Sequence, residues 1–312
     1  MPEPRRLLAV PNFSEGRNAT TIDALAAAVQ SGASPSGRAP RLLDVHTDLD
    51  HHRSVLTIAG EPAQLVDALL AAARVARDRI DLSIEHTDPE GRGQHPHVGA
   101  LDVAPFVYVA PAARGEACAA ALAFADVLAS TLDIPAFLYG ELTQDSEHHA
   151  RTRAELRRGG LQRMAERLAD PADALAPDFG PSRPHPTAGA TLVAARPPLV
   201  AFNLQLAPPA TLQDARTVAA RIREGGDSGL PGLRAIGIAL DGGSVAQVSM
   251  NVERPFELPL ADVVERVRAL APVASAELVG LAPAAAFEGF PENLEIPGFD
   301  PQRHLIENAL DA

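Results

Sequence analysis

The sequence predicts an α/β fold made of two subdomains with the same order of elements, and three observations lead to this expectation. The chain has 312 residues, of which 46% are hydrophobic, which is enough for two domains that each bury a core. Strand-like and helical patterns alternate as β-α-β-β-α-β, once in each half. A proline-rich stretch, 170–186, separates the halves.

This order is that of a ferredoxin-like unit, a sheet with its helices on one face. We expect a mixed sheet in each subdomain and a ligand cleft between the two. We place the boundary at Phe179, which gives subdomains 1–179 and 180–312.

In the first half, apolar runs indicate strands and a spacing of three to four residues indicates helices. The expected elements are strands at 7–10, 42–46, 54–58, 100–109 and 135–139 and helices at 19–30, 62–80, 113–132 and 151–168. Pro105 indicates that the strand at 100–109 lies at an edge or contains a bulge. The connection at 47–53 is polar, and we expect function there.

The second half repeats the pattern. Strands are expected at 199–206, 233–240, 245–252 and 276–281, and helices at 211–224 and 258–271. Asp241-Gly242-Gly243 is a strong hairpin signal between the two middle strands.

Composition excludes several classes of protein. The formal net charge is −13, and no basic run suits a nucleic-acid partner. All 27 basic residues are arginine, so lysine Schiff-base, P-loop and pyridoxal phosphate chemistry are excluded. No apolar run approaches the ~20 residues of a membrane span and no signal peptide is recognised, so we expect a cytoplasmic protein without a membrane partner. The single cysteine, Cys118, is expected to pack in a core.

The stretch 91–103 carries the main candidate for catalysis. A glycine-rich loop delivers His95 and His97 directly before a strand. Histidine titrates near neutrality and serves as a general acid or base. His97 points away from His95 if the two alternate along a strand, so we expect His97 to be structural.

Eight motifs spread over nearly the whole chain resemble, in their order, those of the glutamate formiminotransferase family, folate-dependent enzymes of histidine breakdown. The motifs lie at 10–16, 42–45, 95–103, 138–141, 177–181, 189–191, 201–203 and 246–251. The resemblance implies two α/β subdomains with a folate site between them and a homodimer. It implies transfer of the formimino group of N-formimino-L-glutamate to tetrahydrofolate as co-substrate. Since no cyclodeaminase half follows, we expect a monofunctional transferase.

The resemblance also assigns roles to residues. His95 matches the family's catalytic histidine, cast as a proton donor. Apart from the resemblance, Asp44 is our first choice for a carboxylate that orients this histidine, because it ends a strand, whereas Asp102 is expected to cap a turn. At position 46 the family has an assisting carboxylate and this chain has His46.

Binding residues follow in the same way. Asn12 and Arg53 are expected to contact the substrates, with Arg53 holding a glutamyl carboxylate. The stretch 180–189 matches the family's folate-binding segment, with candidates Gly180, Pro181, Ser182, Thr187 and Gly189.

Three alternatives stay open. The first is a folate transferase that uses a formyl donor, such as N-formylglutamate, which His46 and a lengthened loop at 87–92 leave open. A metal-dependent hydrolase of the formimino group would use a centre drawn from histidines 46, 51, 52, 86, 95 and 97 with Asp48 and Asp50. A folate carrier without turnover is the third. We predict no metal, because the histidines lack the i, i+4 spacing of a helical zinc site.

Overall fold

The computed structural model describes residues 6–31, 39–85, 96–143, 151–170, 172–173 and 175–312. It divides into two compact units, Met1–Pro197 and Pro198–Ala312. The expected boundary at Phe179 is therefore wrong. Residues 180–197 belong to the first unit because they include a strand, β7, that lies inside its sheet.

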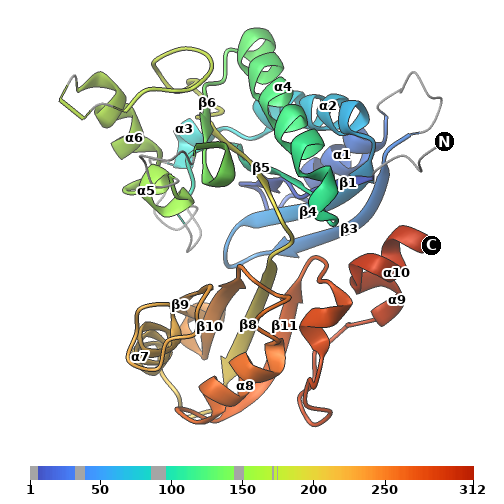
Figure 1. Cartoon of the computed structure of the whole chain (residues 1–312). Coiled ribbons are helices and arrows are strands. Elements are labelled where there is room, and N and C mark those ends of the chain that lie inside the picture. Colours follow the sequence, from blue (N-terminus) through green and yellow to red (C-terminus); the bar gives the residue numbers. More distant parts are fainter. Residues whose placement is uncertain (1–5, 32–38, 86–95, 144–150, 171, 174) are drawn as a thin grey trace. The chain divides into compact units, whose positions relative to one another are not determined.

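The first unit is built on a mixed sheet of seven strands (Figure 1). The strands are β1 (Leu7–Ala9), β2 (Asn12–Phe13), β3 (Arg41–Asp48), β4 (Arg53–Gly60), β5 (Leu101–Val107), β6 (Ala136–Leu138) and β7 (Thr191–Arg196). β3 pairs with β4, and β1 and β2 together fill the place between β4 and β5. This part has the strand order of the expected ferredoxin-like unit. β7 and β6 extend it as parallel strands beyond β5.

Three long helices pack together over one face of this sheet. They are α1 (Ala19–Gln30), α2 (Pro62–Arg79) and α4 (Arg114–Leu132). Asn18 fixes the start of α1 because its side chain accepts a hydrogen bond from the Thr21 backbone N–H. α2 begins with Pro62 inside a capping box formed by Glu61 and Gln64.

α4 and the turn η1 (Pro111–Ala113) before it form the one helical stretch, among the described residues, that is long and apolar enough to cross a membrane. In this unit α4 contributes Phe124 and Leu128, both fully buried, to the main core. Phe124 packs against Phe106 of β5 at a ring-centroid distance of 6.0 Å.

The opposite face of the sheet is covered near β7, which differs from the expectation of helices on one face. Leu192 and Ala194 of β7 belong to a second apolar cluster with Leu156 and Met164, while Val193 faces the main core. The covering helices are α5 (Arg153–Arg157) and α6 (Gly160–Ala169). We expected a single helix at 151–168, but Gly159 and Gly160 take φ values of 80° and 70°, which end the first helix and redirect the chain.

Pro105 lies in β5, in the middle of the sheet, so the edge strand was the wrong one of the two expectations. The other, a bulge in this strand, is present as the register shift between Leu101 and Val103. Pro105 stands beside the break between β1 and β2, where its carbonyl accepts a hydrogen bond from the Val10 N–H (3.1 Å). Pro11, at the same break, accepts one from Leu56 (3.1 Å). Proline has no N–H to donate. Pro11 and Pro105 therefore lie where the hydrogen-bond ladder between the strands is already interrupted.

The second unit follows the expected β-α-β-β-α-β order. Its main elements are β8 (Val200–Leu206), α7 (Leu212–Ile222), β9 (Leu233–Leu240), β10 (Val245–Val252), α8 (Leu260–Arg268) and β11 (Val273–Val279). The sheet order is β11-β8-β10-β9, and all three pairings are antiparallel where we expected a mixed sheet. The predicted hairpin is confirmed, with Gly242 and Gly243 at φ values of 65° and 105°.

Shorter elements complete both units. They are α3 (Leu82–Glu85) and η2 (Gly140–Thr143) in the first unit and η3 (Asp241–Gly243), η4 (Ala284–Phe287), α9 (Pro301–His304) and α10 (Ile306–Asp311) in the second. Leu305, between α9 and α10, forms a parallel bridge with Ala282, so the final segment packs back onto its own unit.

Candidate functional site

A polar pocket lies in the first unit where β2 ends and β4 and β5 begin. Four separate parts of the chain line it, and its lining residues are Asn12, Phe13, Ser14, His51, His52, Arg53, Pro96, His97, Asp102 and Arg157. Two arginines and three histidines thus face a space with one lining carboxylate. Such a set of donors favours an anionic ligand.

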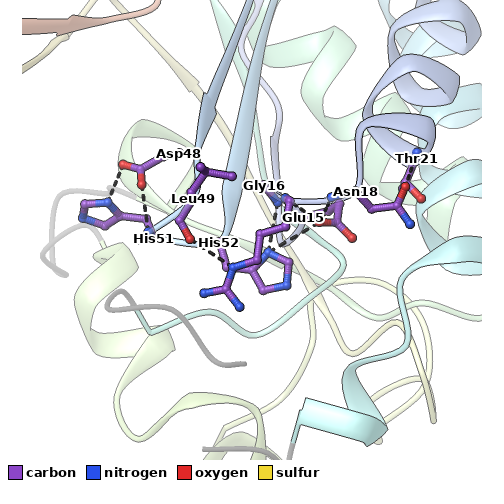
Figure 2. A network of polar contacts seen from close by, with 9 residues as sticks. Glu15, Gly16, Asn18, Thr21, Asp48, Leu49, His51 and His52 are labelled. Atoms are coloured by element: carbon purple, nitrogen blue, oxygen red, sulfur yellow. Dashed lines mark hydrogen bonds and ion pairs between the residues drawn. The ribbon is translucent and has the colours of Figure 1, made fainter. Parts of the chain in front are cut away.

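The turn between β3 and β4 places a histidine and a carboxylate in contact (Figure 2). Asp48, the last residue of β3, accepts a hydrogen bond from the His51 backbone N–H at 2.8 Å, and its other oxygen pairs with His51 Nδ1. His51 is only 4% exposed. Burial alone would raise the pKa of Asp48, but the bonds from His51 lower that pKa to about 2. The ionised carboxylate therefore fixes both the ring and the position of its Nδ1 proton.

A second contact ties this turn to the loop after β2. The Gly16 backbone N–H donates to His52 Nδ1 at 3.0 Å. A Cβ atom on Gly16 would stand 2.3 Å from the Asp48 carbonyl oxygen, so only glycine permits this approach. Figure 2 shows the loop and the turn side by side. A further bond between them comes from Arg17 Nε, which donates to the Leu49 carbonyl at 3.1 Å.

Asp102 enters the pocket through a β-bulge. Asn12 of β2 pairs with Val103 and Phe13 with Leu101, so Asp102 is the extra residue between them. One of its oxygens accepts from the Val98 N–H at 2.8 Å, and the other pairs with Arg157 Nη2 of α5. Asp102 therefore links the segment before β5 to helix α5.

The two arginines of the pocket retain unused hydrogen-bond donors. Among the described residues, the Nε atoms of Arg53 and Arg157 are buried without a hydrogen-bond partner. Burial lowers the pKa of Arg53 and the neighbouring Arg157 lowers it further, while Asp48 and Asp102 oppose this. An arginine stays protonated in proteins, so the cost of this burial favours a bound anion.

The segment before β5 is held in place by a side-chain hydrogen bond from Ser14 and by the close approach of the Gly189 backbone. Ser14 Oγ donates to the Gly99 carbonyl at 2.7 Å. Gly189, at φ 69°, passes so close that a Cβ atom would stand 2.2 Å from the Val98 carbonyl oxygen. The turn just before Gly189 is stabilised by His185, whose Nδ1 accepts a hydrogen bond from the Ala188 N–H at 3.1 Å. Burial, with a contribution from Arg77, lowers the pKa of His185, so the accepting neutral form is favoured.

The structure brings only part of the predicted site together. Asn12 and Arg53 line the pocket, and so do Asp102, expected to cap a turn, and His97, expected to be structural. His95 lies outside the described residues, but its neighbour Pro96 lines the pocket.

Other predicted residues lie elsewhere. Asp44 and His46 pair with Thr57 and Val55 of β4 and are absent from the pocket lining. The predicted folate-binding stretch divides into two parts. Exposed Gly180, with Pro181 and Ser182 after it, lies beside Ala129 and Pro135, whereas Thr187 and Gly189 pack against Leu82 and Val98.

The candidate metal ligands are only partly described. His86 and His95 lie outside the described residues. Within the described ranges, no group of three or more histidine, cysteine, aspartate or glutamate side chains is arranged to hold a metal ion.

The sequence did not single out Arg157 as a site residue. It stands in a segment that also contains Arg151, Arg153, Arg158 and Arg163, and its spacing does not distinguish it from them. A weak signal existed for Asp102, an acidic residue inside an apolar strand pattern, since a buried charge needs a partner.

Comparison with known proteins gives the class and then the family. Residues 6–196 match the formiminotransferase domain, N-terminal subdomain. The chain is 34% identical over 307 residues to glutamate formimidoyltransferase of Streptococcus pyogenes, covering 96% of this chain and 97% of that protein. It is 30% identical over 309 residues to glutamate formimidoyltransferase of Thermoplasma acidophilum, with 97% and 96% covered.

A third relative is longer. The chain is 37% identical over 318 residues to formimidoyltransferase-cyclodeaminase of Sus scrofa, covering 96% of this chain and 56% of that protein. The chain therefore spans about half the length of this relative. These matches make the protein an enzyme of the transferase class. It belongs to the formiminotransferase family, which confirms the resemblance read from its motifs.

Proposed function

We propose that this enzyme transfers the formimidoyl group of N-formimino-L-glutamate to tetrahydrofolate. The names of the relatives support formimidoyl transfer and a glutamate-derived substrate. The observation that carries the proposal is the Arg53 guanidinium, whose Nε is buried without a hydrogen-bond partner among the described residues. It lies in the same pocket as Pro96, the residue after His95. A carboxylate of the donor bound there would stand within reach of the chain segment that carries His95.

The reaction requires the protein to bind both substrates and to transfer protons. A bond forms between the acceptor amine and the amidine carbon, and the bond from that carbon to the glutamate nitrogen breaks. His95, by the family resemblance, donates the proton that the departing nitrogen needs, a contribution of roughly 10²- to 10⁴-fold. Arg53 and Arg157 hold the donor carboxylates and orient the amidine.

The remaining parts of the proposal rest on the family resemblance. Residues 180–189 contribute to binding the folate, with Thr187 and Gly189 placed beside the Val98 segment. The enzyme acts in the breakdown of histidine, in the cytoplasm, as a homodimer and without a metal.

A coupled assay with tetrahydrofolate tests the proposal. Purified protein is given either N-formimino-L-glutamate or N-formyl-L-glutamate, and the folate product is measured by its absorbance. We expect turnover with the formimino donor and a loss of roughly 10²- to 10⁴-fold in kcat for His95→Ala. Turnover with the formyl donor alone supports the alternative that His46 suggests. Metal analysis showing one zinc or iron per chain, with release of the group to water, supports the hydrolase.

A further inference from the structure

The two carboxylates of the proposed donor bring more negative charge than the lining of the pocket balances. The lining contains two arginines, Arg53 and Arg157, and one carboxylate, Asp102, which is already paired with Arg157. A donor with two carboxylates therefore needs a further cation nearby if its charge is to be balanced away from bulk water. The search for this cation rests on the proposed function.

Arg153, the first residue of α5, is such a cation. It precedes Arg157 by four residues, so the two side chains leave the same face of the helix, about 6 Å apart along its axis. This spacing is comparable with the separation of the two carboxylates in a glutamyl group. Arg153 is not a lining residue, but it lies near the lining. The pKa of Arg53 is lowered by burial, then by Arg157 and, to a smaller extent, by Arg153.

The guanidinium of Arg153 contacts an aromatic ring. Its Cζ atom lies 6.0 Å from the centroid of the Tyr139 ring, within the range of a cation–π contact. Tyr139 is itself buried in the apolar cluster that contains Val98 and Leu156. No hydrogen bond or ion pair joins the Arg153 guanidinium to the described residues, although the side chain is half-buried. Its N–H donors therefore remain available to a ligand.

The neighbouring arginines differ from Arg153 in this respect. Several of them pair with carboxylates, and these pairs are Arg151–Asp178, Arg157–Asp102, Arg163–Glu166 and Arg167–Asp173. Arg158 has no such partner among the described residues, but it is exposed, so water solvates its charge. A half-buried arginine that is neither paired nor fully solvated favours a bound anion.

We infer that Arg153 determines specificity for a glutamyl group by binding one of its carboxylates next to Arg157. Both proposed substrates contain such a group, because the donor is a glutamate derivative and tetrahydrofolate ends in a glutamyl residue. The contact with Tyr139 also helps to hold α5 in place, and a purely structural role would affect all substrates alike. The test therefore compares substrates with and without the glutamyl carboxylates.

The experiment compares wild type, Arg153→Gln and Arg158→Gln in the coupled assay. For Arg153→Gln we expect kcat/KM with N-formimino-L-glutamate to fall roughly 10-fold, mainly through KM. N-formimino-γ-aminobutyrate lacks the α-carboxylate, and N-formimino-L-glutamine lacks the charge of the side chain. With the one whose missing carboxylate Arg153 binds, the variant should lose less than about twofold. Arg158→Gln should match wild type with every substrate.

A second pair of substrates tests whether the glutamyl group is that of the folate. In that case the loss appears when tetrahydrofolate is varied and is absent with tetrahydropteroate, which has no glutamyl group. Either pattern supports the inference and names the source of the carboxylate. An equal loss with complete and truncated substrates, or no loss with any of them, would overturn it.

Binding without turnover separates the inference from the proposed function. If the donor is the source, the Kd of glutarate in titration calorimetry should be roughly 10-fold higher for Arg153→Gln than for wild type, while butyrate, with one carboxylate, should bind both alike. If Arg153→Gln fails to fold, Arg153→Lys replaces it and should also bind glutarate more weakly, because lysine lacks the planar fork. A wild type that binds glutarate but does not transfer from the formimino donor would overturn the proposed function alone.

Discussion

Asp102 of β5 and Arg157 of α5 form an ion pair that is nearly excluded from solvent. The two side chains are 5% and 14% exposed. The second oxygen of Asp102 accepts from the Val98 N–H. One carboxylate therefore fixes both a cation of the pocket and the segment that follows His95.

Replacing Asp102 by asparagine should destabilise the first unit strongly. Breaking a buried pair leaves Arg157 without its counter-charge, which costs about 3–5 kcal/mol. Urea unfolding followed by circular dichroism measures the loss. The control is Asp133→Asn, since Asp133 and Arg183 form a pair that is 60% and 63% exposed and should contribute less than about 1 kcal/mol. Equal losses in the two variants would show that the buried pair has no special role.

Removing the Arg53 guanidinium should weaken binding of the donor more than it slows turnover. A hydrogen bond to a charged group contributes about 1.5–3 kcal/mol, so Arg53→Gln should raise the KM of N-formimino-L-glutamate roughly 10- to 150-fold. Inhibition by glutarate, a dicarboxylate without a transferable group, should weaken in parallel. Arg158→Gln is the control, because Arg158 is exposed and does not line the pocket. An unchanged KM for Arg53→Gln would place the carboxylate elsewhere.

Glycine at 189 should be irreplaceable for the shape of the pocket. Gly189→Ala introduces a left-handed alanine, which costs about 1–2 kcal/mol, and a Cβ atom 2.2 Å from the Val98 carbonyl, which forces the segment before β5 to move. We expect lower stability together with lower kcat. Gly115→Ala, in α4 with no atom within 4 Å of the new methyl, should instead stabilise the protein by about 0.5–1 kcal/mol. Thermal unfolding of both variants distinguishes strain from a general intolerance of alanine.

The Asp48 carboxylate should make stability depend on acid pH. Its pKa in the folded protein is about 2, below the ordinary value of 3.8, so the unfolded chain binds the proton more tightly. The stabilisation is present above pH 4 and is lost as pH falls through about 2. The shift corresponds to about 2 kcal/mol. The difference in unfolding free energy between wild type and Asp48→Asn should shrink by that amount between pH 5 and 2, and a constant difference would contradict the assignment.

Much of the fold could be predicted because its signals are local. The helix at 19–30 and the strands at 233–240 and 245–252 are confirmed at their expected bounds. A cap at Asn18 and the turn at Gly242 and Gly243 mark these ends in the sequence itself. β7 was missed because it is a short apolar run next to a proline-rich stretch, and only its parallel neighbours β5 and β6 make it a strand.

Site residues could be predicted only where they lie in sequence motifs that the family shares. Asn12 and Arg53 lie in motifs of the family and line the pocket, whereas Arg157 arrives from a helix that packs there through Leu156. No local pattern separates Arg157 from neighbouring arginines. The cleft between subdomains, the homodimer and the role of His95 stay predictions.

The pocket is lined by residues 12–14, 51–53, 96–97, 102 and 157. Contacts between such distant positions form late, because a long stretch of chain must lose its freedom before they are made. During synthesis, a nascent chain that has passed β5 but not α5 lacks Arg157, the counter-ion of Asp102, and we expect it to bind a dicarboxylate more weakly than the complete unit does. Ligand binding by a growing or truncated chain would therefore report that the first unit has closed as a whole.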